Sequence, residues 1–339
     1  MLVLREGVVT EVGPPAPEQQ LLVDVPGRGP RAATADTALV GPCQVGDQVV
    51  VNTQAADLAL GSGGFDVVHV NLTRGLGGEG LSGAHVMKLN YSSLQHAVLP
   101  VEDGSSDLPP GRPVGVCFLH GQLAPFAWAV GQARGGTKLG YVQGGGGALP
   151  GGHSRTVIEL REQGLLVGTI TAGASYGGEA EAITLAGGIA HGIGELGWDA
   201  AVVAPGPGII GSGSRLGHGG MAALDAAHTA LALGCPVVVA PRMSNGDARD
   251  RHQGCSHHTQ TVLDLLLAPV SVAAPPGAGA EITRGCGHNV VELDVDLEAY
   301  GASGLPGTTM GRSIEDDPLF FGAALAGGAL LASAIDALA

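Results

Sequence analysis

The sequence predicts an α/β protein in which a small all-β, barrel-like domain precedes a doubly wound, Rossmann-like domain built on a parallel sheet. Two patterns lead to this prediction. Residues 1–102 contain short runs of Val and Leu bounded by Gly, Pro and Asp, whereas residues 113–339 alternate apolar runs of strand length with segments of helical length. The polar, Pro- and Gly-rich stretch 103–112 is expected to link the two domains.

The first domain shows no regular helical periodicity, so a compact all-β barrel is the natural arrangement of its strands. They are expected at 8–12, 21–25, 32–35, 48–52, 66–72, 86–90 and 96–101. Barrels of this kind often bind oligonucleotides or sugars, but basic and stacking aromatic residues are scarce here. A structural or dimerising module is the alternative interpretation.

The second domain reads as repeated strand–helix units, and right-handed crossovers between them favour a doubly wound sheet. Strands are expected at 114–119, 139–142, 166–171, 200–204, 237–240, 270–273 and 290–295. Helices are expected at 123–133, 154–163, 179–196, 216–233, 256–267 and 318–338. The uncharged run from Leu319 to Ile335 is short and weakly apolar for a membrane span, so we expect a buried helix.

The charge balance excludes several classes of partner. The chain has 16 Lys and Arg against 31 Asp and Glu, a net charge of −15, and it contains no basic run. Nucleic acids and anionic membranes are therefore not expected as partners. The five cysteines are widely spread and the N-terminus lacks the features of a signal peptide, so we expect a cytoplasmic protein. Helices rich in small residues favour a homodimer.

The strongest functional signal is the segment from Arg242 to Thr259, which follows a predicted buried strand. In open parallel sheets, ligands bind beyond the carboxyl ends of the strands. Composition predicts about three ionisable side chains in such a window of an otherwise charge-poor chain. It holds eight, namely Arg242, Asp247, Arg249, Asp250, Arg251, His252, His257 and His258.

Three chemistries could use this segment. In the first, His252 or His257 is a general acid/base, with Asp247 as a further catalytic candidate. The expected anion-binding residues in the segment are Arg242, Arg249, Arg251 and Ser256, the last as the cap of a helix. In the second, a divalent metal is held by His218, His252 and His258. Since His257 and His258 face different directions on a helix, they are not expected to bind one ion together. In the third, Ser256 or Cys255 acts as a nucleophile.

A second segment, 205–220, is rich in glycine and joins a predicted strand to a predicted helix. Backbone N–H groups at a helix start bind phosphate or carboxylate, and Ser212, Ser214 and Arg215 would add donors. A full dinucleotide fingerprint normally follows the first strand of its unit, whereas this is the fourth of the series. A nicotinamide cofactor is therefore not expected.

Three strings, Tyr176–Ala182, Pro205–His218 and Arg242–Thr259, resemble an uncharacterised bacterial family, number 3866 among the domains of unknown function. The resemblance covers nearly the whole chain and implies no activity. From the residues themselves, we expect a small-molecule hydrolase or group transferase that binds an anionic or phosphorylated substrate. The alternatives are a non-catalytic ligand-binding or assembly module and a metal-dependent hydrolase.

Overall fold

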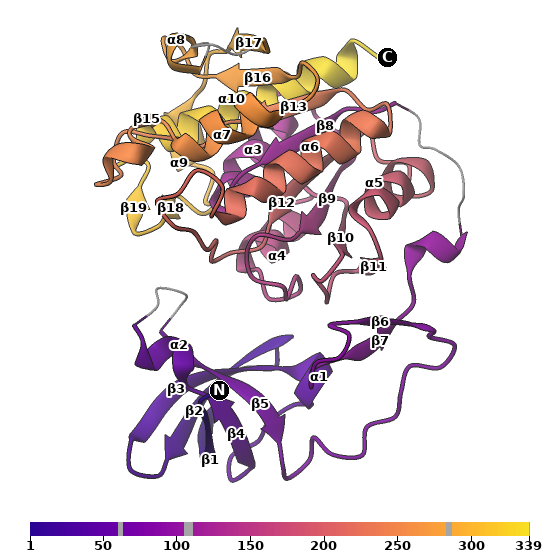
Figure 1. The fold of residues 1–339 in the computed structure, drawn as a ribbon, viewed down its shortest axis with the longest axis vertical. Coiled ribbons are helices and arrows are strands. Elements are labelled where there is room, and N and C mark those ends of the chain that lie inside the picture. The colour runs from indigo at the N-terminus through magenta and orange to yellow at the C-terminus, as the bar shows by residue number, and fades with distance from the viewer. Residues whose placement is uncertain (60–63, 105–110, 283–286, 339) are drawn as a thin grey trace. The chain divides into compact units, whose positions relative to one another are not determined.

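The structure, a computed structural model, describes residues 1–59, 64–104, 111–282 and 287–338. The chain forms two compact units, Met1–Leu99 and Pro100–Ala339. The first contains a closed barrel and the second a large parallel sheet flanked by helices, so the predicted α/β class is confirmed (Figure 1). Residues 105–110 of the predicted linker lie outside the described residues.

The N-terminal unit is a five-stranded barrel with the strand order β1-β2-β3-β5-β4, closed by the pairing of β4 with β1. Strands β3 and β5 run parallel, whereas the other neighbouring strands of the barrel are antiparallel. Alternate residues such as Val23, Val49 and Val51 fill the interior. The elements are β1 Leu4–Val12, β2 Glu18–Val25, β3 Gly29–Asp36, α1 Thr37–Val40, β4 Gln48–Asn52, α2 Gln54–Asp57 and β5 Asp66–Asn71.

The last two predicted strands of this unit do not join the barrel. They form a separate antiparallel pair, β6 Val86–Lys88 with β7 His96–Val98. Three-residue strands contribute few ladder hydrogen bonds, and five strands already close the barrel.

The C-terminal unit is built on eight parallel strands in the order β11-β10-β9-β12-β8-β13-β16-β17. Strands β12 and β13 are buried along their full length, as expected for strands covered on both faces. The strands are β8 Val114–Cys117, β9 Leu139–Gly144, β10 Gly168–Ala172, β11 Ala180–Ala182, β12 Ala200–Pro205, β13 Val237–Ala240, β16 Ser271–Ala274 and β17 Asn289–Glu292.

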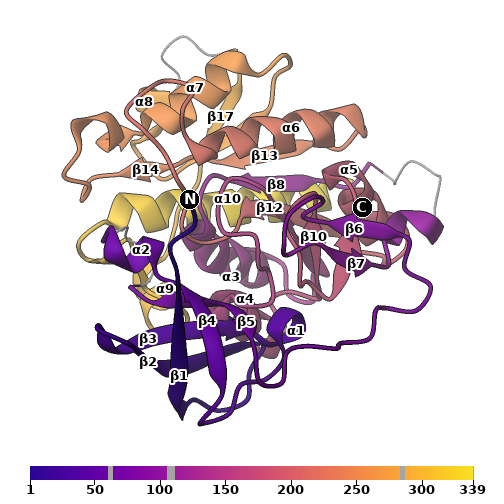
Figure 2. The same ribbon diagram turned by 60° about the horizontal axis from the view of Figure 1, so that its bottom comes forward.

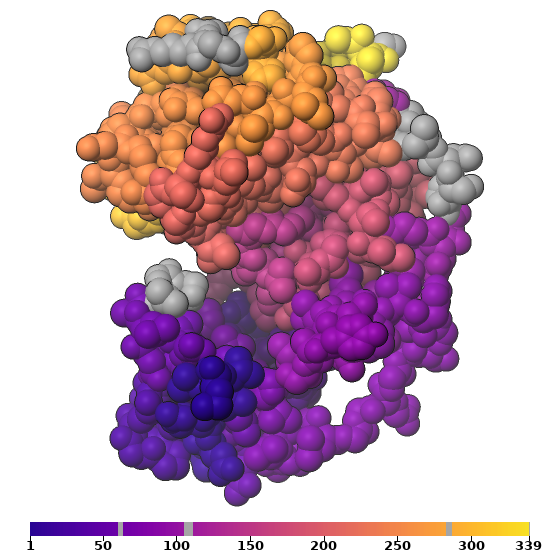
Figure 3. Space-filling view, viewed as in Figure 1, coloured from indigo at the N-terminus to yellow at the C-terminus, as the bar shows by residue number. Residues whose placement is uncertain are grey.

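Helices cover both faces of this sheet (Figures 1 and 2). One layer contains α3 Leu123–Ala133, α4 Arg155–Glu162 and α10 Pro318–Asp336, and the other α5 Leu185–Gly194, α6 Ala222–Ala232 and α7 His257–Leu265. Helices α3 and α10 pack closely because Gly328 has no Cβ. A Cβ at this position would lie 2.1 Å from the carbonyl oxygen of Phe126. In the space-filling view, the face of the C-terminal unit turned to the viewer is continuous (Figure 3).

Helix α10 is long and apolar enough to cross a membrane by length and composition, the single such helix in the described chain. It packs against α3, β13 and β16, and 67% of its most apolar window is buried inside the unit. The prediction of a buried helix is confirmed.

The predicted helix 179–196 begins later than expected, at Leu185, because residues 180–182 form the edge strand β11. Ladder bonds to β10 fix this strand, and the Glu179 carboxylate binds Arg161 at 2.7 Å. The remaining short elements are β14 Met243–Ser244, β15 Gly254–Cys255, α8 Gly279–Ile282, α9 Leu297–Gly301, β18 Thr308–Thr309 and β19 Arg312–Ser313.

Candidate functional site

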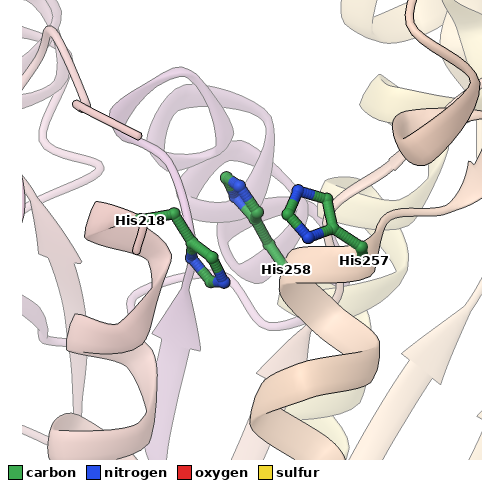
Figure 4. Close-up of side chains that lie close together, drawn as sticks. All are labelled: His218, His257 and His258. Atoms are coloured by element: carbon green, nitrogen blue, oxygen red, sulfur yellow. The ribbon is translucent and has the colours of Figure 1, made fainter. Parts of the chain in front are cut away.

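Four imidazole rings form a cluster at the carboxyl end of the sheet. The rings of His218 and His258 stack with centroids 3.7 Å apart and planes 9° from parallel. The ring centroid of His257 lies 4.4 Å from that of His258, and the centroid of His252 lies 4.9 Å from it. Figure 4 shows His257 and His258 at the start of α7 and His218 on the segment that leads into α6. We call these four residues the histidine cluster.

The chain returns from the end of β13 to α7 through the short antiparallel pair β14–β15. Ser256 caps α7, as predicted, because its Oγ accepts the backbone N–H of His258 at 3.2 Å. The same Oγ lies 2.8 Å from Nδ1 of His252, which fixes that ring. Ser256 is fully buried. These bonds give Ser256 a structural role in positioning two of the histidines.

Arg242 brings a positive charge into the cluster. Its side chain is 3% exposed, and burial lowers its pKa to about 10, so it is charged at neutral pH. Nη1 donates to Nδ1 of His258 at 3.0 Å, which leaves the ring proton of a neutral His258 on Nε2. Nη2 lies 3.5 Å from Oδ2 of Asp247.

Asp247, a predicted catalytic candidate, is paired with arginines in the structure. Arg249 donates to its two oxygens from Nε at 2.8 Å and Nη2 at 2.7 Å, and Arg312 lies 3.6 Å away. The hydrogen bonds from Arg249 hold the pKa of Asp247 far below its usual range. A carboxylate that stays ionised at every physiological pH is a poor general acid. Arg249, predicted to bind an anion, is engaged here instead.

Asp317, which the sequence analysis missed, holds the segment that follows β14. This fully buried carboxylate accepts the hydroxyl of Ser244 at 2.6 Å, the N–H of Asn245 at 3.0 Å and Nε of Arg312 at 2.9 Å. No local pattern reveals this role, because Asp317 lies 73 and 72 residues along the chain from Ser244 and Asn245, whose segment it holds. Its negative charge also enters the charge balance of the site. The guanidinium groups of Arg242, Arg249 and Arg312 pair with the carboxylates of Asp247 and Asp317, which leaves one positive charge in excess within this network.

The histidines of the cluster are neutral at pH 7. Burial, reinforced by the charges of Arg242 and Arg249, lowers the pKa of His252 to about 3. Burial and Arg242 lower that of His258 to about 2. The pKa values of His218 and His257 are also lowered, in both cases chiefly by burial. Since the charge of Arg242 acts on all four rings, a negative charge placed among them would raise these pKa values.

Several buried nitrogen atoms of the site have no hydrogen-bond partner within the described chain. They are Nδ1 and Nε2 of His218, Nε2 of His257 and Nε of Arg242. An unsatisfied buried polar group costs about 1–3 kcal/mol, and such groups are rare in folded proteins. The guanidinium Nε can only donate a hydrogen bond. The partner that it lacks is therefore an acceptor atom.

A cavity of about 400 Å³ adjoins the cluster, and His218 forms part of its wall. It opens at the carboxyl ends of β8, β9, β10 and β12, where open parallel sheets bind ligands. The backbone approaches closely here: Gly146 has φ +97°, and a Cβ on it would lie 2.5 Å from the carbonyl oxygen of Gly219. Other lining residues include Gly144, Gly145, Gly173, Pro205, Leu185, Met221 and Asp225.

The predicted anion-binding loop around Ser212, Ser214 and Arg215 is not arranged as expected. Residues 211–218 form a turn closed by the Gly211–His218 bridge, which uses the loop's own backbone N–H groups. The two serine hydroxyls bind each other at 2.8 Å, and the exposed Arg215 binds Asp264 at 2.8 Å. Arg251, also predicted to bind the anion, is exposed.

The predicted metal ligands differ from the histidines that the structure brings together. Donor atoms of His218, His257 and His258 lie within 4.8 Å of one another, whereas His252, named in the prediction, is bonded to Ser256. The expectation that the rings of neighbouring His257 and His258 point to different places is wrong. Both rings contact His218: that of His258 stacks on it, and the ring centroid of His257 lies 5.3 Å from that of His218. Lone pairs lie in the ring planes, however, so two parallel stacked rings do not point at one ion. The Nδ1 lone pair of His258 is also taken by Arg242.

The sequence model of the family described as "Protein of unknown function (DUF3866)" matches residues 32–328. The chain therefore belongs to this family, as the resemblance implied. No curated protein matches it. Among solved structures, the crystal structure of YjeQ from Thermotoga maritima matches with 12% identity and a TM-score of 0.15. The match covers 50% of this chain and 51% of that chain, and a similarity this low carries no argument.

Proposed function

We propose that this protein is a hydrolase or group transferase that binds the anionic group of a small-molecule substrate between Arg242 and the histidine cluster. The observation that carries the proposal is the buried Nε of Arg242, which donates to no atom of the described chain. An anionic oxygen supplies the acceptor, and it offsets the excess positive charge contributed by the arginines. The adjoining cavity accommodates the rest of the substrate.

Within this proposal His257 is the general acid/base. Its buried Nε2 has no partner in the described chain, whereas His252 is bonded to Ser256 and His258 to Arg242. The free site holds His257 neutral, so it accepts a proton from a water or hydroxyl nucleophile. The bound anion raises the pKa of His257, and the imidazolium then donates the proton to the leaving group.

The test of binding uses inorganic phosphate and isothermal titration calorimetry. We expect Arg242→Met to weaken phosphate binding at least tenfold, since hydrogen bonds to a charged group contribute about 1.5–3 kcal/mol. Met fills a similar volume without leaving a buried charge. The control is Arg155→Met, which removes an exposed arginine at the start of α4. Equal phosphate affinities of wild type and Arg242→Met would overturn the proposal.

The test of catalysis is turnover of phosphate monoesters and acyl phosphates. General acid/base groups contribute about 10²–10⁴-fold, so His257→Gln is expected to lower kcat by at least a hundredfold. Phosphate affinity should change much less. Phosphate binding without turnover of any compound in the panel would support the ligand-binding module over the enzyme.

A metal-dependent hydrolase is the second candidate, and the proximity of donor atoms from His218, His257 and His258 is the observation that favours it. The two ring nitrogens of His218 have no hydrogen-bond partner within the described chain, so both are open to an ion. The excess positive charge opposes a divalent cation. Zinc titration at pH 7.5 separates the two candidates: stoichiometric binding lost in His218→Gln supports the metal, and phosphate binding in the presence of a chelator supports the anion.

A further inference from the structure

The cavity beside the histidine cluster has a strongly uneven charge distribution. At one side it reaches His218, whose neighbours include the buried Arg242. Elsewhere its walls are glycine backbone and small or aliphatic side chains, among them Leu185 and Met221. No aromatic side chain other than His218 lines the cavity within the described chain. The walls therefore favour a compact substrate over a stacked nucleobase.

Asp225, which is exposed to solvent, is the one acidic side chain among the described residues that line this cavity. It lies in the first turn of α6, where the helix dipole stabilises its negative charge. No arginine or lysine lines the cavity with it, and within the described chain its carboxylate has no ion pair or side-chain hydrogen bond. The cavity thus carries a carboxylate, and His218 in its wall is a neighbour of Arg242.

We propose that the substrate carries an amine in addition to its anionic group, and that Asp225 binds this amine. The inference rests on the proposed function, since it assigns the anionic group to Arg242. An amine at this end of the substrate pairs with the exposed Asp225 carboxylate, since the hydrogen-bond donors of an ammonium match the acceptors of a carboxylate. The net charge of −15 also repels a simple anion, and an added positive group reduces this repulsion.

The experiment compares two series of probes by isothermal titration calorimetry. One series is ω-aminoalkyl phosphates with two to six carbons, and the other is alkyl phosphates of the same chain lengths. For a partly exposed ion pair we expect the best aminoalkyl phosphate to bind wild type about three- to fivefold more tightly than its alkyl counterpart. The preference should depend on chain length, because the two charged ends must reach Arg242 and Asp225 together.

Asp225→Asn is expected to abolish this preference without weakening alkyl phosphate binding, since the amide no longer repels an anion. The matched control is Asp264→Asn, which removes a half-exposed carboxylate of α7 that does not line this cavity. Equal affinity of wild type for both series at every length would overturn the inference while leaving the anion site intact. Failure of both series to bind would overturn the proposed function itself.

Discussion

Buried carboxylates and arginines occur in both units, but they are satisfied in different ways. In the barrel, Asp47 accepts hydrogen bonds from Arg74 at 2.8 Å, Asn71 at 2.8 Å and the backbone N–H of Gln44 at 2.9 Å. Among the described residues of 1–99, no buried side-chain nitrogen or oxygen lacks a partner. In the described part of the C-terminal unit, Arg242 and three histidines, His191, His218 and His257, retain buried nitrogen atoms without one.

The difference separates charges that stabilise the fold from charges that prepare a site. The carboxylate of Asp47 closes the turn before β4, and each of its contacts strengthens the barrel. The buried Nε of Arg242 donates to no atom of the described chain. Because an unsatisfied buried donor costs free energy, this arginine lowers the stability of the C-terminal unit. Under the proposed function, a ligand supplies the acceptor that Nε of Arg242 lacks within the described chain.

The largest expected effect is a difference in acid stability between the two units. The unfolded chain binds protons on His252 and His258 below their ordinary pKa of about 6.5, whereas the folded unit, with pKa values of about 3 and 2, does not. Stability is therefore complete above pH 6.5 and falls below it, by about 3 kcal/mol at pH 5.5 for the two residues together.

Urea unfolding at pH 8 and pH 5.5 measures this loss. The two tryptophans of the chain, Trp128 and Trp198, both lie in the C-terminal unit, so their fluorescence follows that unit alone. Replacing both His252 and His258 by Gln should remove about 3 kcal/mol of the pH dependence. The part that remains comes from other buried histidines such as His120, whose pKa is lowered by burial to about 4. A wild-type C-terminal unit equally stable at the two pH values would show that these histidines are not held neutral.

In the barrel, Asp47→Asn is expected to cost about 2 kcal/mol. Hydrogen bonds from Arg74 lower the pKa of Asp47 to about 2, from an ordinary value of 3.8. This contribution is complete above pH 4 and is lost as the pH falls toward 2. Urea unfolding followed by circular dichroism at pH 7 measures the change. Asp24→Asn, at an exposed position of β2, is the control and should have little effect. A loss of phosphate affinity in Asp47→Asn would contradict the separation of the two charge networks.

The smallest effect is expected for Asp317→Asn, which tests whether Asp317 positions the site. The amide keeps most of the shape but loses the charge that binds Arg312, so phosphate affinity should fall about threefold to tenfold. Asp336→Asn, at the exposed end of the same helix, should leave phosphate affinity unchanged. If both variants lost stability equally and neither lost phosphate affinity, Asp317 would have only a structural role.

Much of the fold was predictable because its signals are local. The apolar runs that became β12 and β13 marked strands buried on both faces, and the helix 123–133 was placed at its observed bounds. The edge strand β11 was missed because three residues are too few to show a period. The histidine segment was found because its charge density departs from the composition of the chain.

The sequence by itself determined the two-part architecture and the segment that carries the site, since hydrophobic periodicity and charge density are properties of neighbouring residues. Only the tertiary structure decided which groups meet there. In the structure His257 lies in the histidine cluster, Arg249 donates to Asp247, and Asp317 accepts the N–H of Asn245. Nε of Arg242 has no hydrogen-bond partner in the described chain. These contacts join segments that are distant along the chain, and parallel strands bring them together because their carboxyl ends share one edge of the sheet.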